Sequence, residues 1–180
     1  MPTIYFCRHG QDEDNAEGLL NGTRDRPLTS KGKEQAVTTA GLLKDKGITK
    51  VFCSPMIRTT ETATIIASEA GLPAPVAMPE IGPRDFGVLT GKPKADIAKY
   101  SSNNIQTDSE LIFLDPEGAE PFPAVYERAK KVIESLPNEN VLLVSHIDVM
   151  KMLVGAANGT GWEVAVKDFY GNSEVAEVSK

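Results

Sequence analysis

The chain has 180 residues, of which 41% are hydrophobic and 24% charged, and its net charge is −6. These values are ordinary for a globular protein, and the length suits one core, so we expect a single domain over residues 1–180. The acidic balance argues against nucleic-acid binding, which needs clustered cations. No apolar run is long enough to span a membrane and no signal-peptide pattern is present, so we expect no membrane contact and a cytoplasmic location.

The chain begins with an apolar segment, Thr3 to Cys7, that is rich in β-branched and aromatic residues and predicts a buried strand. Arg8, His9 and Gly10 follow directly. In open α/β sheets, ligands bind at the carboxyl ends of the strands. A guanidinium offers a planar fork of donors for phosphate, and an imidazole can attack or carry a proton. This strand end is therefore a candidate phosphate site.

The next segments alternate between helix and strand. After a polar stretch (11–15) and a loop, Thr29 or Ser30 can cap a helix that stops at Gly47. Residues 50–53 predict a second buried strand, and Ser54 can cap a helix over 55–70. Strand, helix, strand and helix with short links are typical of a parallel sheet.

The second half is less regular. Residues 72–93 predict an irregular segment with a possible edge strand at 76–78, then a short helix at 94–100 and a mobile flap or loop at 101–120. The remaining expected elements are a helix over 123–136, a buried strand over 141–146, a helix over 147–157 and an edge strand over 174–178. An edge strand can pair between subunits, which makes a homodimer possible.

Both histidines of the chain, His9 and His146, stand at the carboxyl ends of strand-like runs. If the sheet is parallel and the two strands are neighbours, the imidazoles meet at one edge. Arg58 lies one turn into a helix that begins at that edge. With Arg8, these groups would form a pocket for an oxyanion.

These motifs resemble those of the histidine phosphatase superfamily, in its phosphoglycerate mutase-like branch 1. The resemblance covers most of the chain in order and implies a single-domain, three-layer α/β/α sandwich with a mostly parallel sheet. The matching residues are Phe6 to Gly10, Asn15, Asp25 to Thr29, Gly32, Gln35, Ala36, Ser54 to Arg58, Thr62, Ala63, Asp85 to Gly87, Gly91, Val144 to His146 and Tyr170 to Ser173.

The resemblance also implies roles for individual residues. His9 would attack the phosphoryl group and carry it as a phosphohistidine until water releases phosphate. Arg8, Arg58 and His146 would hold the phosphoryl oxygens, and Asn15 would add a hydrogen bond. No cofactor or metal is implied, in agreement with the lack of a Cys/His cluster of metal-ligand spacing.

The chain departs from the family at the general acid. The family usually places a Glu four residues before the Gly of the Asp-Phe-Gly motif, and Pro83 stands there. Such a Glu protonates the leaving alkoxide and then activates water. Glu80 is the first substitute if a local insertion separates it from the motif, and Asp85 and Asp148 are the others.

The leading prediction is thus a metal-independent phosphatase acting on a small phosphorylated substrate. A cofactor-dependent phosphoglycerate mutase is an alternative, although such mutases usually carry inserted segments. A phosphohistidine phosphatase acting on a protein, or a phosphate-binding module with weak turnover, is another, because Pro83 leaves the acid position empty. Cys7 and Cys53, each near the end of an apolar run, are expected to be buried free thiols.

Overall fold

The computed structural model describes residues 1–180 and is built on a five-stranded sheet in the order β3-β2-β6-β1-β7. Strands β3, β2, β6 and β1 run parallel, and β7 pairs antiparallel with β1 at the edge. The expected parallel sheet with a C-terminal edge strand is therefore present. The strands are β1 (Thr3–Arg8), β2 (Lys50–Cys53), β3 (Val76–Ala77), β6 (Val141–Ser145) and β7 (Val175–Ser179).

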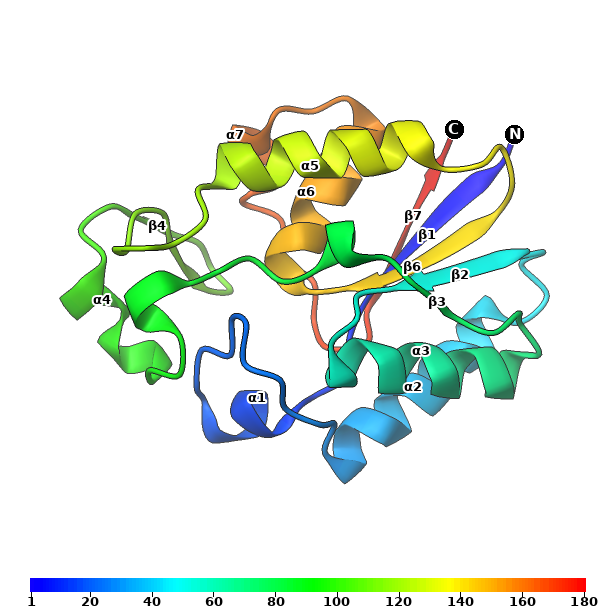
Figure 1. The fold of residues 1–180 in the computed structure, drawn as a ribbon, viewed down its shortest axis with the longest axis horizontal. Helices are drawn as coiled ribbons and strands as arrows, with labels where there is room; N and C mark the ends of the chain where they lie inside the picture. Colours follow the sequence, from blue (N-terminus) through cyan, green and yellow to red (C-terminus); the bar gives the residue numbers. More distant parts are fainter.

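Helices cover both faces of the sheet and complete three layers (Figure 1). Helices α2 and α3 pack against each other on one face, and α5, α6 and α7 lie on the other (Figure 1). The expected α/β/α sandwich is confirmed. The helices are α1 (Glu13–Glu17), α2 (Ser30–Leu43), α3 (Ile57–Ala70), α4 (Ile97–Tyr100), α5 (Phe122–Ser135), α6 (Ile147–Asn158) and α7 (Trp162–Ala165).

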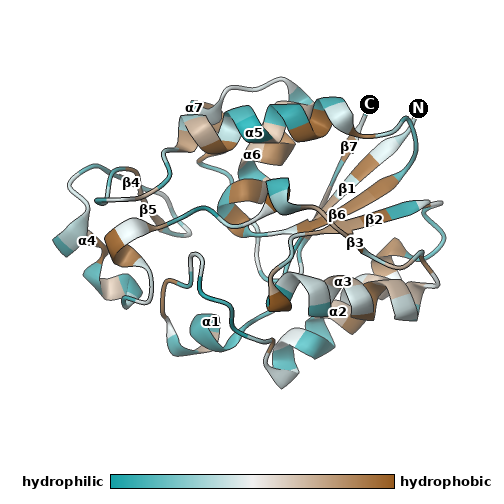
Figure 2. Ribbon diagram, in the orientation of Figure 1, coloured by the Kyte–Doolittle hydropathy of each residue, from teal (hydrophilic) through white to brown (hydrophobic).

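The core is split by the sheet into two clusters because successive side chains of a strand point to opposite faces. Ile4 and Phe6 of β1 belong to the cluster under α5 and α6, whereas Tyr5 and Cys7 belong to the cluster under α2 and α3. Strand β6 is buried along its whole length, as a central parallel strand should be. In Figure 2 the central strands are mainly hydrophobic, and the outer side of α5 carries hydrophilic residues.

A smaller lobe lies beyond the carboxyl edge of the sheet. It contains α4, the antiparallel hairpin of β4 (Asn104–Gln106) and β5 (Leu111–Phe113), and two short 3₁₀ turns at Gly87–Leu89 and Lys94–Asp96. A third 3₁₀ turn, Pro79–Ile81, packs against α5, and Ile81 belongs to the core cluster under α5 and α6. Its own small core includes Phe86 and Phe113, whose rings pack edge-to-face at 4.9 Å. The segment expected as a flap or loop at 101–120 thus holds a hairpin.

Helix boundaries differ from the expectations at several points. Helix α3 begins at Ile57 with Met56 as its N-cap, so Ser54 is free for another role. Helix α2 is capped by Thr29 as expected but ends at Leu43. The short helix α1, whose N-cap Asp12 accepts from the amide of Asn15, was not expected.

Both cysteines are buried free thiols, as the sequence predicts. Burial raises the pKa of Cys7 to about 12. The structure contains no helix that is both long enough and apolar enough to cross a membrane.

Candidate active site

The two histidines meet at the carboxyl edge of the sheet. Strands β1 and β6 are parallel neighbours, with Arg8 opposite Ser145 in the register, so the residues that follow each strand lie side by side. The ring centroids of His9 and His146 are 5.4 Å apart. The convergence expected from the sequence is present.

His9 is oriented by its own backbone. Its Nδ1 donates to the carbonyl of Gly10 at 2.7 Å, which leaves the unprotonated Nε2 without a hydrogen bond in the chain. Burial, followed by the charges of Arg58 and Arg8, lowers the pKa of His9 well below 6.5. A neutral imidazole with one free nitrogen is a competent nucleophile at neutral pH.

His146 has both ring nitrogens occupied. Its Nδ1 accepts from Nε of Arg58 at 3.2 Å, and its Nε2 therefore carries the proton and donates to the hydroxyl of Ser54 at 2.9 Å. Burial, followed by the charge of Arg58, lowers the pKa of His146 well below 6.5. His146 is thus held as a neutral ring of fixed tautomer beside His9.

Arg58 is completely buried beneath this pair. Its terminal nitrogens donate to the carbonyls of Gly22 and Arg24, and Nε lies 3.5 Å from the carboxylate of Asp12. Burial lowers the pKa of Arg58, although the charge of Asp12 opposes the shift. Two of the five guanidinium N–H groups of Arg58 have no hydrogen-bond acceptor in the chain. Arg58 can therefore donate to an oxyanion while its Nε positions His146.

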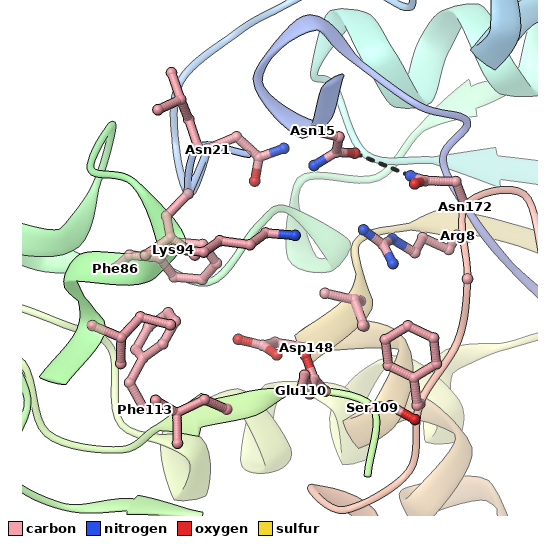
Figure 3. Close-up of a pocket in the computed structure, with 17 residues that line it drawn as sticks. Arg8, Asn15, Asn21, Phe86, Lys94, Ser109, Glu110, Phe113, Asp148 and Asn172 are labelled. Carbon is pink, nitrogen blue, oxygen red and sulfur yellow. Dashed lines mark hydrogen bonds between the residues drawn. The ribbon is translucent and has the colours of Figure 1, made fainter. Parts of the chain in front are cut away.

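A cavity of about 380 Å³ is lined by Arg8, the residue before His9 in the chain. His9, Arg58 and His146 are not among its lining residues. Arg8 donates through Nη1 to the carbonyl of Tyr170 at 2.8 Å, while its Nε has no partner. Asn15 and Asn172 line the same side of the cavity and are hydrogen-bonded to each other at 3.0 Å (Figure 3). Asn172 also donates to the carbonyl of His9 at 3.2 Å, which joins this wall to the histidine pair.

The rest of the cavity combines an apolar wall with one cation. Lys94 reaches into the open space in Figure 3 and forms no ion pair within the chain. The apolar wall comes mostly from the smaller lobe and from the loop after α1, and it includes Leu19, Leu20, Phe86, Ile97, Leu111 and Phe113. An anion with an attached organic group would fit a space of this composition.

Two of the three expected acid candidates lie outside the cavity. Glu80 is exposed on the turn Pro79–Ile81, because its neighbour Ile81 is anchored in the core and accepts from the hydroxyl of Ser145. Asp85 is also exposed, and one of its oxygens accepts from the amide of Gly87. The preference for Glu80 therefore rests on a side chain that the fold turns toward solvent.

The carboxylates that do line the cavity are Asp148 and Glu110. Asp148 lies in the first turn of α6 and pairs with the buried Arg84 at 3.2 Å. Glu110, just before β5, was missed by the sequence reasoning, because only the hairpin brings it to the site. The short apolar run from Leu111 to Leu114 in an otherwise polar segment was the available signal. No group of three or more His, Cys, Asp or Glu side chains is arranged to hold a metal ion.

Similarity to solved structures supports the same fold. A mycobacterial glucosyl-3-phosphoglycerate phosphatase superposes with a TM-score of 0.80 at 20% identity, over 98% of this chain and 89% of that one. A putative alpha-ribazole-5'-P phosphatase from Escherichia coli superposes with a TM-score of 0.79 at 26% identity, over 98% and 89%.

Sequence relatives include both phosphatases and mutases. The adenosylcobalamin/alpha-ribazole phosphatase of Escherichia coli is 29% identical over 87% of this chain and 79% of its own length. The 2,3-bisphosphoglycerate-dependent phosphoglycerate mutase of Rhizobium etli is 31% identical over 85% and 78%. The family model of the histidine phosphatase superfamily (branch 1) matches residues 4–178, and the chain belongs to this superfamily.

Proposed function

We propose that this protein is a phosphatase that hydrolyses phosphomonoesters, without a metal, through a phosphohistidine on His9. The observation that carries the proposal is the free Nε2 of His9, 5.4 Å by ring centroid from His146, on the residue that follows the cavity-lining Arg8. Membership of the superfamily and phosphatases among the relatives support the same reaction class.

In this reaction Nε2 of His9 attacks phosphorus. Nδ1 keeps its proton, which stays hydrogen-bonded to the carbonyl of Gly10. Arg8 and Asn15 hold the non-bridging oxygens from the cavity wall. Arg58 stabilises the charge that develops on the phosphoryl group, and His146 does so when its Nε2–H moves from the hydroxyl of Ser54 to a phosphoryl oxygen. Water then attacks the phosphohistidine and releases phosphate.

The substrate we propose is a small phosphorylated molecule in the cytoplasm, with no role for nucleic acid or membrane. The cavity volume of about 380 Å³ suits a ligand of metabolite size. Pairing of the β7 edge between two copies would give a homodimer, which size-exclusion chromatography with light scattering would test.

Release of nitrophenol from p-nitrophenyl phosphate in the presence of a chelator tests the proposal. Wild-type protein should release it, and His9→Ala should abolish release while remaining folded. Acid-labile labelling should appear on wild-type protein and not on His9→Ala. Absence of release by wild type, or equal release by His9→Ala, contradicts the phosphatase.

A mutase is the second candidate, because a phosphoglycerate mutase is among the relatives. It predicts that isomerisation of phosphoglycerate outpaces phosphate release from the same substrate. A phosphohistidine phosphatase or weak binding module is favoured by Pro83 at the family's acid position. It predicts dephosphorylation of a phosphohistidine protein with little turnover of alkyl phosphates.

A further inference from the structure

The cavity contains a carboxylate that the family pattern does not provide for. Pro83 occupies the position at which the superfamily usually carries its acid, and Glu80 and Asp85 are exposed outside the cavity. A phosphatase that cleaves alkyl phosphates still needs a proton donor, because an alkoxide is a poor leaving group. The donor must therefore come from Asp148 or Glu110.

Asp148 is already engaged by an arginine. It lies in the first turn of α6, where the helix dipole favours negative charge, and it pairs with Arg84 at 3.2 Å. Arg84 is itself buried, with its guanidinium 4.1 Å from the ring centre of Phe122. Asp148 therefore serves as the partner of a buried guanidinium, which leaves Glu110 as the candidate proton donor.

Glu110 is differently placed. The turn before β5 fixes it, because the hydroxyl of Thr107 accepts from its amide and its carbonyl accepts from the amide of Thr107. Its side chain is 24% exposed, and it pairs with the ammonium of Lys151. That ammonium also lies 4.0 Å from Asp148, so Glu110 shares its single counter-ion with a second carboxylate.

Lys151 completes the arrangement. It is fully buried on α6, one turn after Asp148, and Glu110 is its only hydrogen-bond partner. Lys151 therefore ties Glu110 to α6 and fixes its carboxyl group at the cavity wall.

Glu110 also faces the phosphate end of the cavity. Burial lowers the pKa of Arg8, and the charge of Glu110, followed by those of Asp12 and Asp148, opposes this shift. Figure 3 shows Glu110 and Asp148 together across the cavity from Asn15. A phosphate held by Arg8 and Asn15 would thus have its ester oxygen directed toward Glu110.

We propose that Glu110, which lies on the β4–β5 hairpin and pairs with Lys151, is the general acid and base of this site. The proposal rests on the proposed phosphatase function. In the first step Nε2 of His9 bonds to phosphorus, the P–O bond to the leaving group breaks, and the proton of Glu110 passes to the departing oxygen. In the second step the Glu110 carboxylate takes a proton from water as its oxygen bonds to phosphorus. The P–N bond then breaks and its electron pair returns to His9.

The test compares two substrates whose leaving groups differ in their need for a proton. Glu110→Gln preserves the size of the side chain and an acceptor for Lys151, and it removes the transferable proton. We expect kcat/KM for glycerol phosphate to fall about 10²–10⁴-fold. For p-nitrophenyl phosphate it should fall less than about tenfold, since nitrophenolate leaves unprotonated. Phosphohistidine should then accumulate on His9, because the base of the second step is missing.

Matched variants separate this role from a structural one. Glu117→Gln removes an exposed carboxylate of the same segment and should leave both substrates unchanged. Equal losses on both substrates with Glu110→Gln would indicate a merely structural tether and overturn the proposal. A leaving-group-selective loss with Asp148→Asn instead would also overturn it.

Failure of the proposed function gives a different result. Wild-type protein that neither releases phosphate from p-nitrophenyl phosphate nor becomes labelled on His9 contradicts the phosphatase itself, and with it the role of Glu110. Wild-type protein that is active while Glu110→Gln hydrolyses glycerol phosphate at the full rate contradicts the role of Glu110 alone.

Discussion

Arg58 donates a hydrogen bond of 3.2 Å from its Nε to Nδ1 of His146, across 88 positions of the chain. The same guanidinium donates to the carbonyls of Gly22 and Arg24, so it also holds the loop before α2. Arg58 is therefore a support of the site as well as a candidate ligand for the phosphoryl group.

Arg58→Ala should destabilise the protein strongly. It leaves two buried carbonyls and the carboxylate of Asp12 without their partner, and loss of one member of a buried ion pair costs about 3–5 kcal/mol. Urea denaturation measures the change. Lys130→Ala is the control, because Lys130 forms a surface pair with Glu127 that is worth about 0–1 kcal/mol. Equal effects of the two variants would contradict a supporting role for Arg58.

The buried histidines should make stability fall in acid. Their pKa values in the folded protein lie well below 6.5, so below pH 6.5 the unfolded chain binds more protons than the folded one. The neutral histidines contribute fully to the free energy of unfolding above pH 6.5. This contribution is lost as the pH falls toward the pKa values of the folded protein. Each histidine contributes a slope of about 1.4 kcal/mol per pH unit. Denaturation midpoints between pH 5 and 7.5 should show a shallower slope in His9→Gln, and an unchanged slope would refute the assignment.

Ser54→Ala should affect His146 rather than helix α3. The hydroxyl accepts from Nε2 of His146, and a buried donor left without a partner costs about 1–3 kcal/mol. Nitrogen NMR of the imidazole should show the proton on Nε2 in the wild type. Ser102→Ala, on an exposed residue, should change neither stability nor the ring. Loss of helix by circular dichroism without any effect on His146 would support a capping role instead.

Arg84 and Asp148 should be energetically coupled. Arg84→Leu leaves Asp148 as a buried charge without its main partner, which costs about 3–5 kcal/mol. Asp148→Asn in the same chain should recover part of this loss, with a coupling energy of about 0.5–3 kcal/mol in a double-mutant cycle. Additivity within about 0.5 kcal/mol would show that the pair is not an interacting unit.

The sheet and the histidine pair could be predicted because the signals are local. Apolar runs ending in His9 and His146 define two buried strands, and parallel strands bring their carboxyl ends to one edge. Thr29, one of the two residues expected to cap the first long helix, caps it for the same local reason.

The acidic side of the site could not be predicted because it depends on long-range pairing. Glu110 reaches the cavity only through the hairpin of β4 and β5, short strands with little pattern of their own. Glu80 looked suitable in sequence, but the burial of Ile81 decides which way the turn faces. Ser54 was expected to cap a helix because a Pro follows it, but its hydroxyl instead accepts a hydrogen bond from the distant His146.

The pairing of β7 with β1 brings residues near the two ends of the sequence together around His9. The amide of Ser173 donates to the carbonyls of Arg8 and His9, and the carbonyl of Tyr170 accepts from Arg8. A chain still emerging from the ribosome would carry His9 long before the wall formed by residues 170–175 had been synthesised. Synthesis of residues 170–175 is therefore required before the site can assemble, and a polypeptide cut short before residue 170 would lack part of it.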